Sequence, residues 1–304
     1  MNRHVKHLIP LIICVSLLAA PSIGQEKTGV SAMFKEMGTV ENETFLPGSV
    51  RVSSDFKHIT YAVRVGERQR VVVDGKEHKV YDGVMIGTPM FLGDTSQVVY
   101  IAKENGEKKG EETVGDKWFL VMGGKEHIKY DFIAPHSIIS GRNNKRMVYI
   151  ARMGEQWMLV EGTKEYPGGL GIEKSSVMFG PDGNHLVYVL RKDSKYHIYR
   201  DGTIGPGFPW IDDKSLTFSP DGKHLVYIAG NRREQDVWLN NQKIGTFTNI
   251  LTKTPDDPRR MMGMRPGRMS AKPEQKQKFS FGVDGKLRFY AIKDKKLIQV
   301  VVKP

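Results

Sequence analysis

A short segment that recurs along the chain constrains the fold more than any other feature of the sequence. Its clearest copy, FSPDGKHLVYIA at residues 218–229, joins an apolar residue to a Pro-Asp-Gly turn and then to five consecutive apolar or aromatic residues. Each copy has an Asp or Asn in the turn and a Tyr six residues later. The Tyr anchors stand 39, 49, 39, 39 and 63 residues apart, at Tyr61, Tyr100, Tyr149, Tyr188, Tyr227 and Tyr290. A regular period of this length indicates a repeat architecture.

Each copy of the repeat reads as four short strands separated by turns. In the copy over residues 216–249, two strands flank the Pro-Asp-Gly turn, and Asn240-Asn241 separates a third strand from a fourth. Asp74-Gly75 and Asp201-Gly202 occupy the same place in other copies, and these residue types tolerate the positive φ of a two-residue hairpin turn. Consecutive apolar residues in the second strand indicate that both faces of that strand are covered. We therefore expect each sheet to be sandwiched between two neighbouring sheets.

A period of about 40 residues with four strands in each copy is typical of β-propeller blades. The sequence therefore predicts an all-β chain, folded as one six-bladed propeller over residues 25–304. The expected blades are 46–89, 90–137, 138–175, 176–215, 216–251 and 278–304. Because the sixth blade ends at its third strand, we expect the N-terminal strand 33–45 to pair beside it and close the ring.

The turn segments also carry a family resemblance. FSPDGKHLVYIA and FGPDGNHLVYVL resemble the Pro-Asp-Gly group of WD-like repeats, found in TolB-like periplasmic propellers and in the propeller domains of prolyl-oligopeptidase relatives. Four of the six copies place Phe three residues before the turn acid, whereas the third copy has Ser140 and Asn143 at these two positions. The resemblance implies a propeller without the hydrolase domain, because the chain ends after the repeats. As in TolB-like proteins, it also implies a protein partner.

The N-terminus has the pattern of an export signal. Arg3 and Lys6 precede an apolar run, and small residues then suit cleavage after residue 24, although a retained anchor is the alternative. The formal charge of +12 falls by these two cations to +10. The only cysteine, Cys14, lies inside the signal, so the mature chain has no thiol and no Cys-ligated metal. We expect a monomer in the periplasm or the medium, without a membrane span, that meets anionic envelope components more readily than nucleic acid.

Two insertions interrupt the 39-residue rhythm. The first, residues 103–112, is rich in charges of both signs and predicts a protruding hairpin. The second, residues 252–277, is an insertion loop with seven basic residues, three acidic residues, four Met and four Pro. Guanidinium groups and adaptable Met side chains are suited to an anionic or amphipathic partner, and a solvated loop is the alternative. The candidate partner-binding residues are Arg259, Arg260, Arg265 and Arg268.

The fourth copy contains a further candidate for recognition, the segment GPGFPW at residues 205–210. Pro and Gly favour a segment held away from the strand ladder, which would present Phe208 and Trp210 to a partner. The alternative is that these rings pack against the adjacent blade, as large aromatic side chains more often do.

The residues that suggest chemistry recur at equivalent repeat positions. The turn acids Asp55, Asp94, Asp182, Asp221 and Asp284 are expected to bond their own turns around a ring instead of converging as a catalytic pair. The same argument applies to the row His58, His185 and His224, which is therefore not expected to bind a metal. No nucleophile elbow, zinc-protease motif or phosphate-binding loop is present, so no catalytic, metal or cofactor residue is assigned.

The sequence thus predicts an exported, non-catalytic propeller that binds a protein in the cell envelope. The alternative is a propeller that binds or acts on an anionic polysaccharide at the tunnel mouth. The two functions differ in what they require of the ionisable side chains. An enzyme needs such side chains from several blades to lie together at one place, with shifted pKa values.

Overall fold

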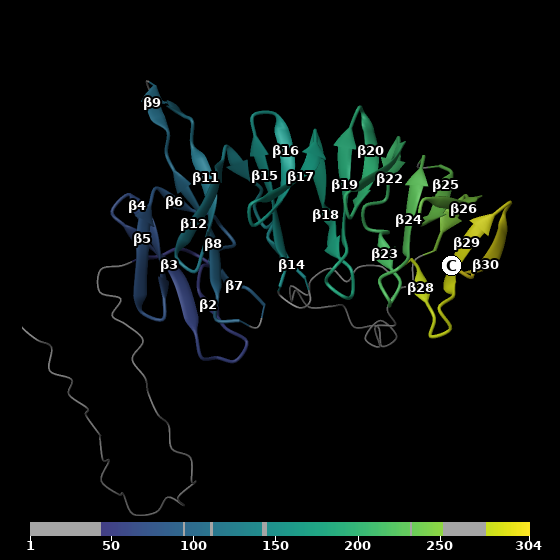
Figure 1. Ribbon diagram of the computed structural model, residues 1–304, viewed down its shortest axis with the longest axis horizontal. Coiled ribbons are helices and arrows are strands. Elements are labelled where there is room, and N and C mark those ends of the chain that lie inside the picture. The colour runs from purple at the N-terminus through teal and green to yellow at the C-terminus, as the bar shows by residue number, and fades with distance from the viewer. Residues whose placement is uncertain (1–43, 94, 110–111, 142–144, 232, 252–277) are drawn as a thin grey trace, which may run out of the picture. The chain divides into compact units, whose positions relative to one another are not determined.

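The structure is a computed structural model that describes residues 44–93, 95–109, 112–141, 145–231, 233–251 and 278–304. These residues belong to one compact unit, residues 38–304. All regular elements among them are β-strands, arranged in antiparallel sheets that follow the repeat (Figure 1). The all-β fold is therefore confirmed. We name the repeated groups of strands modules 1 to 6.

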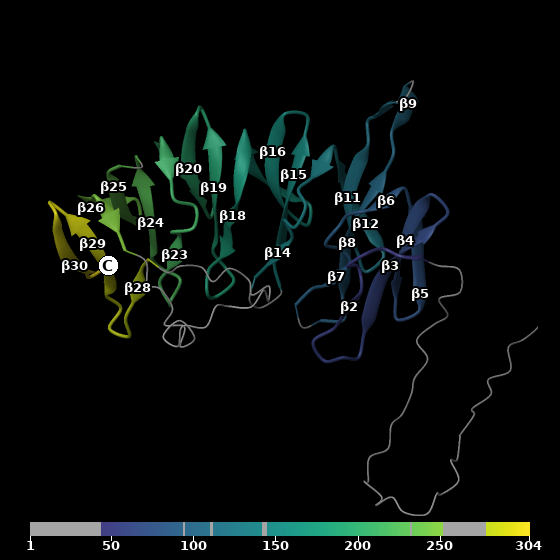
Figure 2. The same ribbon diagram turned by 180° about the vertical axis from the view of Figure 1, so that it is seen from behind.

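Modules 1 and 2 each form a five-stranded sheet. The strands of module 1 are β1 (Thr44–Phe45), β2 (Arg51–Val52), β3 (Ile59–Val65), β4 (Arg68–Val73) and β5 (Lys76–Tyr81). Those of module 2 are β6 (Gly83–Val84), β7 (Met90–Phe91), β8 (Val98–Glu104), β11 (Lys117–Met122) and β12 (Lys125–Tyr130). Between β8 and β11, β9 (Glu107–Lys109) and β10 (Glu112–Val114) pair as the hairpin expected there, and β9 extends beyond the other strands of module 2 in both views (Figures 1 and 2).

Modules 3 and 4 share one nine-stranded sheet, because Gly169 of module 3 pairs in parallel with Arg191 of module 4. The strands of module 3 are β13 (Phe132–Ile133), β14 (Ile139–Ser140), β15 (Met147–Met153), β16 (Gln156–Glu161) and β17 (Lys164–Gly169). Those of module 4 are β18 (Gly171–Phe179), β19 (Leu186–Lys192), β20 (Lys195–Arg200) and β21 (Thr203–Phe208).

Module 5 forms a five-stranded sheet and module 6 a four-stranded one. The strands of module 5 are β22 (Trp210–Ile211), β23 (Thr217–Phe218), β24 (Leu225–Gly230), β25 (Gln235–Leu239) and β26 (Gln242–Phe247). Those of module 6 are β27 (Asn249–Ile250), β28 (Ser280–Phe281), β29 (Leu287–Lys293) and β30 (Lys296–Val302). The insertion 252–277, which separates β27 from β28, lies outside the described residues.

In modules 2 to 5, strand pairing begins five to seven residues before the expected blade boundary. Gly83–Val84 pairs with β8, although the first blade was expected to run to residue 89. Phe132–Ile133 and Trp210–Ile211 pair in the same way with β15 and β24. In modules 1, 2, 3 and 5 the first strand is thus in two parts separated by a short loop, and the earlier part is only two residues long, too short for a periodic pattern; in module 4 it is one continuous strand, β18.

A row of buried hydroxyl groups bonds the first-strand segment of modules 1 to 5 to the second strand. The Thr88 hydroxyl donates to Met85 O and accepts a hydrogen bond from Ile101 N of β8. The equivalent residues accept from the backbone N–H thirteen positions later, which would otherwise be buried without a partner. They are Ser49, Ser137, Ser176 and Ser215, and with Thr88 they follow the 39, 49, 39 and 39 spacing of the Tyr anchors.

Apolar layers fill the space between consecutive modules. Tyr81 and Phe119 pack with Tyr100 between modules 1 and 2, and comparable clusters join each later pair. The second strands β3, β8, β15, β19 and β24 are buried over most of their length, as their consecutive apolar residues predicted. The Tyr anchors are buried in modules 1 to 5.

Module 6 differs from this pattern. Its anchor Tyr290 is 52% exposed, and Leu297 and Val301 on the same face are exposed as well. On the other face, Leu287 and Phe289 pack against module 5. Within the described residues, the expectation that each sheet is sandwiched between two neighbouring sheets is wrong for module 6, because only one of its faces is covered.

The position of the N-terminal strand is tested only in part. Residues 33–43 lie outside the described residues, and Thr44–Phe45 pairs with β3 of module 1. For these two residues the expected pairing beside the C-terminal strand is wrong. Within the described ranges, β30 pairs only with β29, so no closed sheet is present there.

Candidate functional site

The turn acids bond their own turns, as the sequence predicted for this position. Ser53 Oγ and Lys57 N both donate to Asp55, and Ser219 Oγ and Lys223 N donate to Asp221. These bonds favour the carboxylate, so the pKa values of Asp55 and Asp221 lie below their ordinary value. Asp94 and Asn143 lie outside the described residues.

The histidine row has a structural partner in each module. His58 Nδ1 lies 2.7 Å from Asp74 Oδ2, and His185 Nδ1 lies 2.7 Å from Asp201 Oδ2. His224 Nδ1 lies at the same distance from Asn240 Nδ2. Within the described ranges, no group of three or more His, Cys, Asp or Glu side chains is placed to hold a metal ion.

The same row explains the recurrent Phe. The His185 ring stacks on Phe218 of the next module, with ring centroids 6.2 Å apart, and the His58 ring lies tilted against Phe91 at 6.5 Å. In module 3 this position is Arg146, whose guanidinium lies 5.0 Å from the Phe179 ring centroid and forms a bidentate pair with Glu161. The row therefore links neighbouring modules through contacts between a cation or imidazole and an aromatic ring.

Shifts of pKa in the described residues move ionisable groups away from neutral pH. Burial raises the pKa values of the phenols of Tyr100, Tyr188 and Tyr227, so they stay protonated. Burial lowers the pKa values of the imidazoles of His78 and His127. A general acid or base works best with a pKa near the operating pH, and none of these shifts produces one.

One cavity does bring turn residues of two modules together. A space of about 530 Å³ between modules 5 and 6 is lined by Asp221 and His224 on one side and by Asp284 and Lys303 on the other. Asp284 is held by Arg288, whose guanidinium donates to both carboxylate oxygens and lowers the pKa of Asp284. Asp221 and Asp284 thus line the same cavity, while each carboxylate is bonded within its own module.

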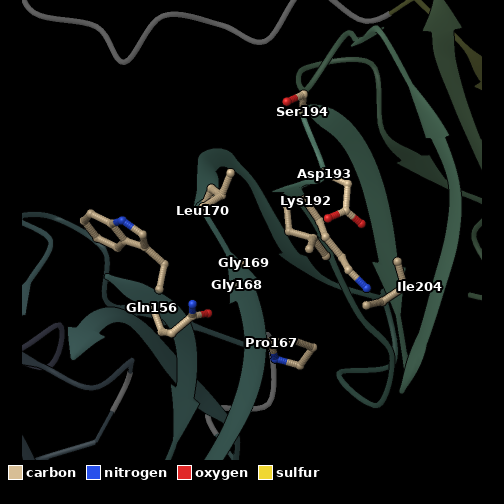
Figure 3. Close-up of a pocket in the computed structure, with 11 residues that line it drawn as sticks. Gln156, Pro167, Gly168, Gly169, Leu170, Lys192, Asp193, Ser194 and Ile204 are labelled. Atoms are coloured by element: carbon tan, nitrogen blue, oxygen red, sulfur yellow. The ribbon is translucent and has the colours of Figure 1, made fainter. Parts of the chain in front are cut away.

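A second cavity, of about 470 Å³, lies between modules 3 and 4 and is half open to solvent. Figure 3 shows Pro167 to Leu170 of module 3 on one side and Lys192, Asp193 and Ile204 of module 4 on the other. Trp157 and Leu190 complete its apolar lining. Leu170 is 51% exposed and Ile204 36% exposed, so two aliphatic side chains face solvent at its mouth. We call this space the Gly169 cavity.

The Gly169 cavity coincides with a break in the repeat. The last strands of modules 1, 2, 4 and 5 end on a buried aromatic residue, and module 3 has Gly169 at this position. The register is the same in all five modules, because each of these residues pairs with the equivalent residue of the third strand. The pairs are Tyr81↔Gln69, Tyr130↔Trp118, Gly169↔Trp157, Phe208↔Tyr196 and Phe247↔Gln235.

Close backbone contacts explain why this stretch consists of glycine. A Cβ on Gly168 would lie 2.4 Å from Trp157 O, and a Cβ on Gly169 would lie 2.4 Å from Arg191 O. Gly169 also has φ +60°, a conformation that other residues adopt at a cost. The sequence analysis missed this site, and its signal was the absence of an aromatic residue from an otherwise regular row.

The structure does not present the predicted aromatic pair for recognition. Phe208 is 7% exposed and packs between Tyr227 and Trp238, and Trp210 is half-buried against the core of modules 5 and 6. The alternative that these rings pack against the adjacent module is therefore the correct one. Arg259, Arg260, Arg265 and Arg268 lie outside the described residues.

The chain has structural similarity to propeller proteins at low identity. TolB from Acinetobacter baumannii is 14% identical, with a TM-score of 0.31 over 81% of this chain and 61% of that protein, so the chain spans less than two thirds of its length. The Pseudomonas aeruginosa periplasmic gluconolactonase PpgL is 11% identical, with a TM-score of 0.30 over 84% of this chain and 85% of that one. The Dos1 propeller is 10% identical, with a TM-score of 0.36 over 84% of this chain and 69% of that one.

Similarities of this size identify no activity, substrate or partner for the chain. The sequence matches no family model and no curated protein. In the part of the chain that the structure describes, no helix is long and apolar enough to cross a membrane.

Proposed function

We propose that the chain is an exported six-bladed β-propeller, similar to TolB-like propellers, that serves as a non-catalytic protein-binding scaffold in the periplasm or outside the cell. The Gly169 cavity is the observation that carries this proposal. Leu170 and Ile204 stand exposed at the mouth of a half-open space of about 470 Å³. Exposed apolar side chains around a cavity are typical of surfaces that a partner covers.

The ionisable side chains support binding over catalysis. The turn acids and the histidine row are held by bonds within their own modules, and their positions repeat from module to module. A catalytic centre requires such groups to converge on one reacting atom. Export of the protein rests on the signal pattern of residues 1–24.

The proposal is tested by isolating a partner and measuring its affinity. Immobilised protein of residues 25–304 is incubated with an envelope extract, the retained proteins are identified by mass spectrometry, and each is purified and titrated against wild type and variants. We expect Ile204→Lys to weaken binding at least about tenfold, because a cation would be buried in an apolar contact. Ile128→Lys is the matched control, since Ile128 is also on a fourth strand and is 37% exposed.

A further variant examines the insertion loop 252–277. If the loop contributes to binding, replacing Arg259, Arg260, Arg265 and Arg268 with Ser also lowers the affinity for the purified partner. The scaffold proposal fails if no purified protein binds the chain, or if every retained protein binds wild type, Ile204→Lys and the four-Arg variant with equal affinity.

The cavity between modules 5 and 6 favours a second candidate, the binding of an anionic polysaccharide. Lys303 and His224 line it and supply donors for sugar carboxylates. Calorimetric titration with an oligogalacturonate tests this candidate. Lys303→Ala is expected to weaken binding more than Lys164→Ala, a change of an exposed lysine in module 3. Equal affinity of the two variants would remove this candidate.

A further inference from the structure

We propose that the Gly169 cavity binds an aromatic side chain of the partner protein. This inference rests on the proposed protein-binding function and specifies its chemistry. The ligand class is a Phe, Tyr or Trp ring presented by a polypeptide, inserted between modules 3 and 4.

The first argument comes from the equivalent positions of the repeat. The rings of Tyr81, Tyr130 and Phe208 each contact the Tyr anchor of the following module, with centroids 6.1, 6.2 and 6.3 Å apart. Module 3 has no ring at this position, and the next anchor, Tyr188, stacks on Tyr199 of its own module at 4.7 Å. The fold therefore places a ring from this position between modules 1 and 2, 2 and 3, and 4 and 5, whereas β17 has glycine there and places Tyr166 in the interface three residues earlier.

The second argument comes from the lining of the cavity. Tyr166 and Tyr199 occupy the part of the interface beside Tyr188, with centroids 5.9 Å apart. The cavity extends from Gly169 toward Leu190, whose Cδ1 would lie 3.5 Å from a Cβ on Gly169. Trp157, half-buried, supplies an indole for offset or edge contact with an inserted ring.

The mouth of the cavity suits a ring that is attached to a polypeptide. Gln156, Lys192, Asp193 and Ser194 line it together with the aliphatic side chains (Figure 3). Asp193 and Ser194 form the turn between β19 and β20, with φ +49° and +60°. These polar groups can pair with the peptide groups on either side of an inserted ring, so the ring is buried while its backbone remains hydrogen-bonded.

The volume of the Gly169 cavity agrees with an aromatic side chain as its occupant. The equivalent space between modules 4 and 5 is lined by Phe208 and measures about 330 Å³, against about 470 Å³ for the Gly169 cavity. The larger space lies where the chain lacks its own ring. It is also within the range of about 300–1,000 Å³ that is usual for ligand pockets.

Methyl-resolved NMR tests the inference with N-acetyl-phenylalanine amide as the ring probe and N-acetyl-alanine amide as the control. We expect the phenylalanine probe to shift the methyl signals of Leu170, Leu190 and Ile204 saturably, with Kd in the range of about 1–10 mM for a single side chain. The methyl signals of Ile86 and Leu297 serve as references, because both side chains are exposed and both residues are distant from Gly169 in the sequence. The alanine probe is expected to leave all five unchanged.

Two variants test whether the probe binds in the Gly169 cavity or on another surface. Ile204→Lys is expected to raise the Kd of the phenylalanine probe at least about fivefold, and Ile128→Lys to leave it unchanged. Circular dichroism melting confirms that both variants fold. If Ile204→Lys is unstable, Leu170→Ser, a change of an exposed side chain, replaces it with the same expected result.

The inference is overturned if the phenylalanine probe shifts no cavity methyl signal, shifts the reference signals equally, or binds Ile204→Lys like wild type. A shorter peptide from the purified partner provides the second arm, with its aromatic residue replaced by Ala. Loss of peptide binding on that replacement supports the inference, and retention contradicts it. Failure of the scaffold proposal is distinguishable, because then no purified partner binds whatever the ring probe does.

Discussion

At the scale of single residues, the buried hydroxyl row has the clearest energetic role. Ser176 Oγ accepts a hydrogen bond from Val189 N at 2.7 Å, and both residues are buried. Without the hydroxyl, the N–H of Val189 would be buried without a partner, a loss worth about 1–3 kcal/mol. In modules 1 to 5 the row thus connects the first-strand segment to the second strand of the same module.

Ser176→Ala is therefore expected to lower the free energy of unfolding by about 1–3 kcal/mol. Urea denaturation measures the change, with the exposed Ser54→Ala as control. Ser176→Thr should retain most of the stability, because module 2 has Thr88 at the equivalent position. An Ala variant as stable as the Thr variant would contradict the role of the hydroxyl.

Glu161 and Arg146 form a pH-dependent contact within module 3, and the same Arg146 guanidinium lies over Phe179 of module 4. Hydrogen bonds from Arg146 lower the pKa of Glu161 below its ordinary value of 4.5, and the Tyr166 hydroxyl adds to this effect. A carboxyl whose pKa is lower in the folded state stabilises the fold above its unfolded pKa. That stabilisation is lost as the pH falls through the folded value.

Glu161→Gln is expected to cost about 1–3 kcal/mol in unfolding free energy at pH 7. The difference from wild type should shrink as the pH falls below 4.5 toward the lower folded pKa, where wild-type Glu161 also becomes neutral. Urea denaturation across this pH range measures it, with the exposed Glu155→Gln as control. A difference that is independent of pH would show that charge has no part in the contact.

At the scale of elements, the end of β17 distinguishes module 3 from its neighbours. Gly169 pairs with Trp157 of β16 and also with Arg191 of β19, so one residue joins two modules. A side chain at this position would meet the Arg191 carbonyl. The same two glycines that permit this close approach leave the Gly169 cavity beside it.

Gly169→Ala is expected to be more destabilising than Gly66→Ala. The two glycines have nearly the same φ, +60° and +62°, but a Cβ on Gly66 has nothing within 4 Å. The strain of positive φ costs about 1–2 kcal/mol in both variants, and the contact with Arg191 O adds about 1–3 kcal/mol in the first. Thermal or urea denaturation of the pair measures the difference, and equal losses would show that the approach of modules 3 and 4 is not tight.

At the scale of the whole molecule, the free edge of β30 and the exposed face of module 6 bear on ring closure. Within the described residues, β30 has one partner strand, and Tyr290, Leu297 and Val301 are exposed. An unpaired edge and an uncovered apolar face both favour a further strand or sheet. We keep the prediction that residues 33–43 pair beside the C-terminal strand.

Deleting residues 25–43 is expected to lower the melting temperature by about 5 °C or more, since a chain of this size loses about 2–4 °C for each kcal/mol. The truncation leaves Thr44–Phe45 in place, so that the pairing of β1 with β3 is retained. Deleting only residues 25–32 is the control. Identical melting temperatures for the two truncations would contradict closure by this segment.

The sequence by itself determined the apolar second strands, the turns and the positions of the Tyr anchors of modules 1 to 5. The turns at Asp74, Asp201 and Asn240 have the expected positive φ, because a two-residue hairpin is encoded by the residues within it. The alternation of a turn acid with a run of apolar residues is equally local. Such features repeat with the period and can be recognised from one copy to the next.

Tertiary structure alone decided which residues meet across modules. The burial of Phe208, the exposure of Tyr290 and the cavity that Asp221 and Asp284 both line each depend on a neighbouring module. The Gly169 cavity lies beside the position at which modules 1, 2, 4 and 5 have a buried ring and module 3 has glycine. The physical reason is that a side chain packs against whatever its neighbour presents, and the period of a sequence does not encode that contact.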